Sequence, residues 1–176
     1  MENTILTRSV FKGKIINVRV DEVLIKEGVT TSREIVEHPG AAAIVALDDK
    51  KQIIMVKQFR KPIERELYEI PAGKLDPGET PLECAKRELY EETGFVAKSW
   101  KEIFSIYTSP GFSNEKIVIY FAECLTRHRQ EPIDQLEISK VEFFSIDILR
   151  DMIFNKEIQD AKTIAGIMAV KSFYVL

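Results

Sequence analysis

Five glutamates stand within the fourteen residues from position 79 to position 92, and only two basic residues accompany them. If this stretch is helical, residues three and four apart share a face, so Glu88, Glu91 and Glu92 project to the same side. Like charges at that spacing repel one another, whereas a hard divalent cation such as Mg²⁺ prefers carboxylate, carbonyl and water oxygens. The spacing is therefore typical of a site for a divalent metal ion. The alternative is an acidic helix face exposed to water.

The residues that flank these glutamates favour the metal site. Residues 80–83, Thr-Pro-Leu-Glu, form an N-terminal capping box with proline at the first helical position, and Gly94 stands where a left-handed C-cap belongs. We therefore expect a helix over residues 81–93. Its apolar positions place Glu88 and Glu92 beside the core instead of opposite it.

Residues 73–95 resemble the signature box of the Nudix hydrolases. The box reads Gly, five residues, Glu, seven residues and then Arg-Glu-Leu-x-Glu-Glu-x-Gly-Phe, and this chain fills every defined position. Nudix enzymes hydrolyse a nucleoside diphosphate linked to another group, and they use Mg²⁺ or Mn²⁺. The resemblance implies that Glu88, Glu91 and Glu92 are metal ligands and that the backbone carbonyl of Ala72 joins them. It also implies more than one ion per site.

The same resemblance assigns catalytic roles beside the metal site. Arg87 holds the glutamates in place by ion pairing, and Glu91 is a candidate catalytic carboxylate as well as a ligand. Water activated at the site attacks the diphosphate, and a general base comes from a carboxylate on the loop before the last strand. Depending on register, that base maps to Asp134, Gln135 or Glu137. We favour Glu137 over Asp134 because its side chain is longer and precedes an incoming strand.

Segments outside the box resemble the ADP-ribose pyrophosphatase subfamily. This resemblance implies hydrolysis of ADP-ribose to AMP and ribose 5-phosphate. The alternatives are another nucleoside diphosphate sugar, such as GDP-mannose or ADP-glucose, and a non-catalytic nucleotide sensor, which the intact glutamate set disfavours. The segments that carry the resemblance are 32–40, 58–60, 69–73 and 109–111 with Glu115, and Pro110 stands sixteen residues after Gly94, where the subfamily typically carries a proline.

Five residues in these segments are candidates for contact with the substrate. Arginine suits bidentate contact with phosphate, so we assign Arg33 and Arg60 to phosphate or ribose; an ordinary surface role is the alternative for each. Ser109 and the backbone of Gly111 are expected to approach the terminal ribose, because glycine lets a ligand come close. Glu115 is expected to accept hydrogen bonds from sugar hydroxyls, unless it is only a surface loop residue.

The order of the remaining elements predicts an α+β fold. Strands stand on both sides of the central helix, and two helices follow at the end of the chain, which agrees with the α/β/α sandwich around a mixed sheet that the Nudix resemblance implies. We expect an antiparallel strand segment at 1–40 and the hydrolase domain at 41–176. The expected strands cover residues 11–25, 30–37, 41–47, 53–59, 66–70, 103–107, 117–122 and 141–144, and the last two helices cover 147–155 and 160 or 161 to 172.

Composition restricts the partners and the setting of the protein. The chain has 176 residues, a net charge of −3 and 45% hydrophobic residues, which suits one small globular domain with a short extension. The negative charge argues against nucleic-acid binding, and no apolar run approaches the ~18 residues of a membrane span. The first residues show no signal-peptide pattern, so we expect a cytoplasmic protein. The subfamily resemblance implies that the first segment exchanges with a second subunit, and its apolar alternation agrees, so we expect a homodimer with Arg33 donated to the partner's site.

Overall fold

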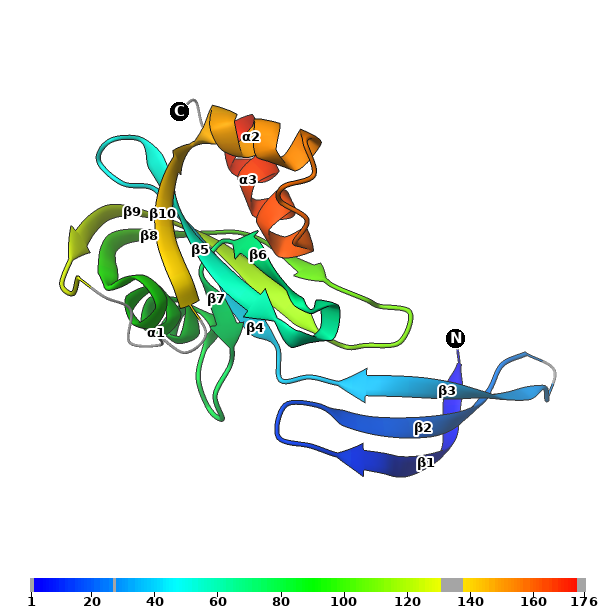
Figure 1. Cartoon of the computed structure of the whole chain (residues 1–176). Coiled ribbons are helices and arrows are strands. Elements are labelled where there is room, and N and C mark those ends of the chain that lie inside the picture. Colours follow the sequence, from blue (N-terminus) through cyan, green and yellow to red (C-terminus); the bar gives the residue numbers. More distant parts are fainter. Residues whose placement is uncertain (1, 27, 131–137, 174–176) are drawn as a thin grey trace. The chain divides into compact units, whose positions relative to one another are not determined.

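The computed structural model describes residues 2–26, 28–130 and 138–173. The chain divides into two compact units, of which the first comprises Met1–Gly40 with Tyr107–Lys116 and the second Ala41–Ile106 with Ile117–Leu176 (Figure 1). Among the helices of the described residues, none is both long and apolar enough to cross a membrane.

The first unit is built on an antiparallel sheet in the order β1-β2-β3, whose strands are β1 (Asn3–Lys12), β2 (Asn17–Leu24) and β3 (Thr30–Glu37). The loop 107–116 joins the end of β3 through backbone hydrogen bonds. The N–H of Val36 donates to the carbonyl of Phe112 (2.8 Å), and the N–H of Asn114 donates to the carbonyl of Val36 (3.2 Å). The loop is therefore hydrogen-bonded to β3 and belongs to the first unit.

The second unit contains two sheets. The sheet β10-β5-β6 is antiparallel throughout, whereas the sheet β7-β4-β9-β8 is mixed, because β4 runs parallel to β9 and antiparallel to β7. The strands are β4 (Ala41–Ala46), β5 (Gln52–Arg60), β6 (Arg65–Glu69), β7 (Ala72–Lys74), β8 (Phe95–Tyr107), β9 (Lys116–Arg127) and β10 (Ile138–Ser145).

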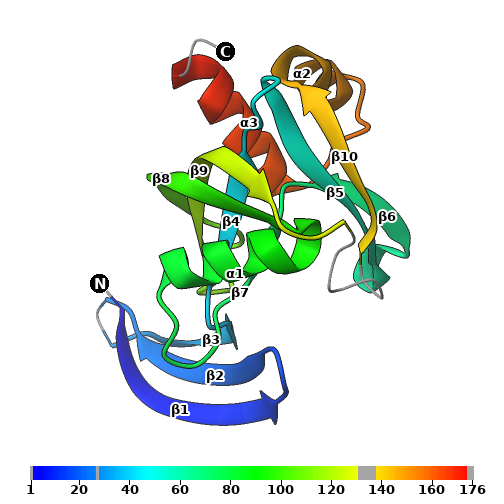
Figure 2. The ribbon, with the colours of Figure 1, turned by 90° about the vertical axis from the view of Figure 1, so that its left-hand side faces the viewer.

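Helices cover both faces of the mixed sheet. These helices are α1 (Pro81–Thr93), α2 (Ile146–Phe154) and α3 (Ala161–Phe173). A short 3-10 helix, Lys61–Ile63, follows β5. Side chains alternate along β4, so Ala42 and Ile44 pack in the cluster that contains residues of α1, whereas Ala43 and Val45 pack in the cluster that contains residues of α2 and α3. Figure 2 shows the resulting layers. The expected α+β fold, with a mixed sheet between helices, is confirmed.

Four strands are longer than the sequence predicts, and the short strand β7 was not expected. Strand β9 continues past residue 122 to Arg127, and β10 begins at Ile138 instead of 141. The largest differences are in β1 and β8. Strand β1 begins at Asn3, upstream of the expected start at Phe11, and all of its residues are exposed. Strand β8 begins at Phe95 instead of Ile103, and residues 95–102 are all partly or fully exposed. In both cases no alternation of buried and exposed positions marks the strand, which is the signal on which sequence prediction depends.

Candidate active site

Helix α1 presents the clustered glutamates, and both of its ends are fixed by local bonds. The hydroxyl of Thr80 accepts from the N–H of Glu83 (3.3 Å), and the carboxylate of Glu83 accepts from the N–H of Thr80 (2.8 Å). At the other end Gly94 adopts φ of 76°, a left-handed conformation, and its N–H donates to the carbonyl of Tyr90. The expected helix over residues 81–93 is confirmed, so the spacing of its glutamates is that of a rigid helix.

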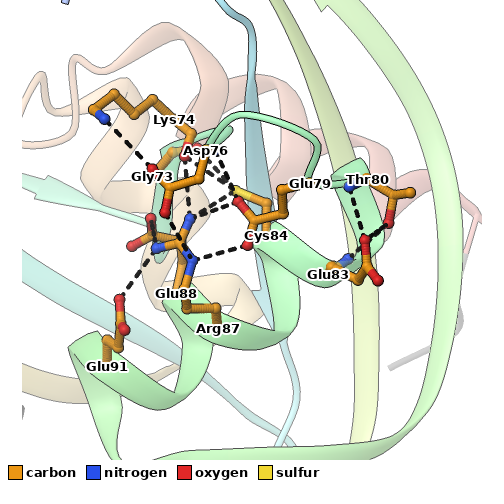
Figure 3. A network of polar contacts seen from close by, with 10 residues as sticks. All are labelled: Gly73, Lys74, Asp76, Glu79, Thr80, Glu83, Cys84, Arg87, Glu88 and Glu91. Carbon is orange, nitrogen blue, oxygen red and sulfur yellow. Dashed lines mark hydrogen bonds and ion pairs between the residues drawn. The ribbon is translucent and has the colours of Figure 1, made fainter. Parts of the chain in front are cut away.

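Arg87 binds three of the glutamates at once (Figure 3). Its Nε and Nη2 donate to the two carboxylate oxygens of Glu79 (2.9 and 2.8 Å), and its Nη1 donates to Glu88 (2.6 Å) and Glu91 (3.1 Å). Nη2 also donates to the carbonyl of Lys74 (3.2 Å). These partners raise the pKa of Arg87, and Arg87 lowers the pKa of Glu79 to about 2. The guanidinium is therefore a permanent counter-charge that ties α1 to the preceding loop.

Glu92 is the buried member of the cluster. Its side chain is almost inaccessible, with the residue 6% exposed, and its Oε2 accepts a hydrogen bond from the N–H of Ala72 (3.0 Å). Burial, with the nearby charge of Glu88, raises the pKa of Glu92 to about 8. Burial also raises the pKa of Glu88, although Arg87 opposes that shift. Two carboxylates are thus held beside the strand β7 in surroundings that disfavour their charge.

Gly73 makes room for one of these carboxylates. A Cβ atom built on Gly73 would lie 1.9 Å from Oε1 of Glu88, a distance that no side chain can occupy. A side chain at this position would displace the Glu88 carboxylate, so glycine allows the strand to approach it closely.

The residues present fit a divalent cation. A buried carboxylate without a counter-ion is costly, and a cation beside Glu92 and Glu88 would remove that cost. Among the residues that the structure describes, no three Asp, Glu, His or Cys side chains already converge as a metal cluster. The positive charge between Glu88 and Glu91 is supplied by Arg87.

Arg60 is one of the two arginine candidates for phosphate, and it lies in the same unit as the glutamates. Its Nε and Nη2 donate to the two carboxylate oxygens of Glu69 (2.7 and 2.6 Å), while its side chain stays 37% exposed. Glu69 is also bound by Lys162. Neither Glu69 nor Lys162 is a site candidate from the sequence, although Glu69 begins the segment 69–73 that resembles the subfamily. The available signal was a glutamate in a strand that runs directly into the apolar residue Ile70.

The other substrate candidates lie in the first unit. Arg33 donates from Nε and Nη2 to the carboxylate of Glu2 (3.1 and 2.5 Å). The carbonyl of Ser109 accepts from the N–H of Phe112 and Ser113 and so shapes the loop. Glu115 accepts from the hydroxyl of Thr108 (2.6 Å), and a side chain at Gly111 would meet open space. Their contacts with a substrate stay predictions, and the base candidates Asp134, Gln135 and Glu137 lie outside the described residues.

Comparisons with known proteins identify the relatives of this chain. It is 44% identical over 163 residues to the ADP-ribose pyrophosphatase of Bacillus subtilis (strain 168), an alignment that covers 92% of this chain and 88% of that protein. It is 40% identical over 167 residues to the methanol dehydrogenase activator of Bacillus methanolicus, with 94% and 90% covered.

A solved structure and a family model agree with these relatives. The crystal structure of an ADP compounds hydrolase superimposes with a TM-score of 0.85 over 98% of this chain and 93% of that one, at 20% identity, which shows the shared fold. The model of the NUDIX domain matches residues 37–166. This match, which includes the whole glutamate helix and the strands around it, confirms the prediction from the signature box: the chain belongs to the Nudix hydrolase family.

Proposed function

We propose that this protein hydrolyses the diphosphate of ADP-ribose to AMP and ribose 5-phosphate, with Mg²⁺ or Mn²⁺ as cofactor. The observation that carries the hydrolytic site is the placement of the buried carboxylate of Glu92 against the backbone of Ala72, with Glu88 and Glu91 on the same helix. The choice of ADP-ribose is supported by the name of the Bacillus subtilis relative, which is similar along almost the whole chain.

The carboxylates of Glu88, Glu91 and Glu92, with the carbonyl of Ala72, would hold the metal ions. When bound, such ions neutralise the diphosphate and lower the pKa of a water molecule. Arg87 keeps the glutamates in one arrangement through its bonds to Glu79 and Glu88. This fixed arrangement spares the site from reorganising when the substrate binds.

The substrate is oriented by arginine and loop groups. Arg60 would contact a phosphate with the exposed part of its guanidinium, and Arg33, Ser109, Gly111 and Glu115 would contact ribose or phosphate.

A carboxylate of the loop before β10, Glu137 or Asp134, would take the proton from the attacking water. Glu137→Gln and Asp134→Asn, measured separately, should lower kcat by about 10²–10⁴-fold for the true base, with little change in KM. A loss of less than about threefold in both variants would exclude a base in this loop.

The first unit supplies a surface for a second subunit. Strand β1 exposes apolar side chains along its length, including Ile5, Leu6 and Val10, each 57–60% exposed. Several large apolar side chains exposed on one strand favour a protein interface. We therefore propose a homodimer formed through residues 1–40, with Arg33 contributed to the partner's site. Sedimentation should show a dimer at micromolar concentration, and a fully active monomer would contradict this assembly.

A substrate panel tests the proposed activity. AMP release from ADP-ribose, with Mg²⁺, with Mn²⁺ and with a chelator, should be compared with hydrolysis of ADP-glucose and GDP-mannose. We expect metal-dependent turnover with the highest kcat/KM for ADP-ribose. A higher kcat/KM for GDP-mannose would show that the enzyme prefers another nucleoside diphosphate sugar. No turnover of any substrate would favour a binding protein.

A further inference from the structure

Glu69, at the end of β6, is a buried carboxylate held by two cations from different elements. It is 1% exposed, and it accepts two hydrogen bonds from Arg60 of β5. Lys162, in the first turn of α3, donates from Nζ to the same carboxylate. Burial disfavours the charge of Glu69, yet the two cations together keep its pKa below the ordinary value.

The two cations differ in their access to solvent. The side chain of Arg60 is 37% exposed, whereas that of Lys162 is 10% exposed. Lys162 also lies 3.0 Å from Oδ2 of Asp160, a residue that accepts from the N–H of Thr163 at the start of α3 (2.9 Å). Lys162 is therefore an internal counter-ion enclosed by two carboxylates, while Arg60 is the cation that an external anion can reach.

The start of α3 also fixes the backbone that leads to the metal ligands. The hydroxyl oxygen of Thr163 accepts a hydrogen bond from the N–H of Ile70 (2.9 Å), the residue after Glu69. Two residues further along, the N–H of Ala72 donates to Glu92. The same helix start thus holds both Glu69 and the strand segment that faces the glutamates of α1.

We propose that Lys162 is a positioning residue for recognition of the substrate diphosphate: it neutralises Glu69 from inside, so that the positive charge of Arg60 stays available to phosphate. With Lys162 present, two carboxylates (Glu69 and Asp160) face two cations, and the cluster is neutral. Without Lys162 the cluster carries a net negative charge, and the charge of Arg60 is neutralised by Glu69. This inference rests on the proposed function, in which Arg60 contacts the substrate.

The test is Lys162→Met, measured by steady-state hydrolysis of ADP-ribose with Mg²⁺. At saturating Mg²⁺, loss of the internal charge should raise KM by about tenfold while kcat stays within about threefold. The metal ligands keep their positions, and excess metal offsets the support that the Lys162 charge gives to ionised Glu92. Lys171→Met is the matched control. It makes the same substitution on α3 and breaks an ion pair with Asp147 (2.6 Å), and it should leave KM unchanged.

Rescue separates charge compensation from a purely structural role. In Lys162→Met/Glu69→Gln both charges are removed, so KM should return to within about threefold of wild type. If Lys162→Met does not fold, Glu69→Gln is compared with the double variant, which differs from it by the same single charge, and the double variant should have the higher KM. A Lys162→Met enzyme that unfolds at lower temperature but keeps the wild-type KM would overturn the proposal.

A binding measurement keeps this result separate from the proposed activity. Calorimetric titration of ADP into wild type and Lys162→Met should show about tenfold weaker binding by the variant. If wild type releases no AMP from ADP-ribose, the proposed function fails, and the ADP titration still decides the role of Lys162. Equal ADP affinities would overturn it.

Discussion

The backbone N–H of Ala72 donates a hydrogen bond of 3.0 Å to Oε2 of Glu92, and this bond joins the start of β7 to the last turn of α1. One partner is a main-chain group, so its position depends on the fold and not on a side-chain rotamer. The other is a carboxylate whose pKa is raised to about 8 because the protein surrounds it. Because Glu92 is buried, its ionised form destabilises the metal-free protein, and the same carboxylate is a strong ligand for a cation.

The contribution of Glu92 to the stability of the metal-free protein should therefore fall as pH rises. Because the folded pKa of Glu92 is raised from 4.5 to about 8, the folded chain keeps a proton that the unfolded chain releases. The stabilisation is complete below pH 4.5 and is lost as pH passes 8. Urea unfolding in a chelator at pH 5, 7 and 9 should show Glu92→Gln gaining stability relative to wild type by up to a few kcal/mol at the highest pH. A difference that is constant with pH would contradict a buried, titrating Glu92.

Binding of Mg²⁺ should release protons. Metal ligands must be deprotonated, and Glu92 is protonated at neutral pH in the free protein. Affinity should therefore increase between pH 6 and pH 8, by at most about tenfold per pH unit for this one group. Calorimetric titrations in two buffers of different ionisation enthalpy measure the proton release directly. Identical heats in both buffers at pH 7 would show that no proton leaves.

Gly73→Ala should damage the site without unfolding the protein. The added Cβ would lie 1.9 Å from Oε1 of Glu88, so this carboxylate must move. Misplacing a metal ligand typically costs about 10–100-fold in metal affinity or activity. Lys74→Ala, a neighbouring change at a side chain that is 48% exposed, is the control and should retain activity. Wild-type activity in Gly73→Ala would mean that Glu88 has no fixed role.

Arg87→Met should lower kcat by about 10–100-fold, because three glutamates lose the guanidinium that holds them. Lys86→Met removes the adjacent basic side chain, which is exposed on α1. This control should keep kcat within about twofold. Equal effects of the two substitutions would show that only the total charge of the helix matters.

The sequence predicts those parts of the site that local signals specify. The bounds of α1 follow from its capping box and Gly94, which act within one turn of the helix. The positions of Glu88 and Glu92 then follow from helical spacing. The fold class follows in the same way from the order of elements along the chain.

Contacts between distant elements could not be predicted in this way. Glu69 and Lys162 are 93 residues apart, and nothing in their local sequence pairs them. Arg60 was assigned to phosphate from its residue type, but its bidentate bond to Glu69 depends on the antiparallel register of β5 and β6. Strand β1 escaped prediction over its first residues because neither face of it is buried.

The most direct test is AMP release from ADP-ribose by wild type, Glu92→Gln and Glu83→Gln at saturating Mg²⁺. Both substitutions replace a glutamate of α1 by glutamine, but Glu83 belongs to the capping box, where glutamine also serves. We expect Glu92→Gln to lose about a hundredfold or more in turnover while remaining folded, and Glu83→Gln to stay close to wild type. Near-normal turnover by Glu92→Gln would contradict the assignment of Glu92 as a metal ligand and with it the proposed site.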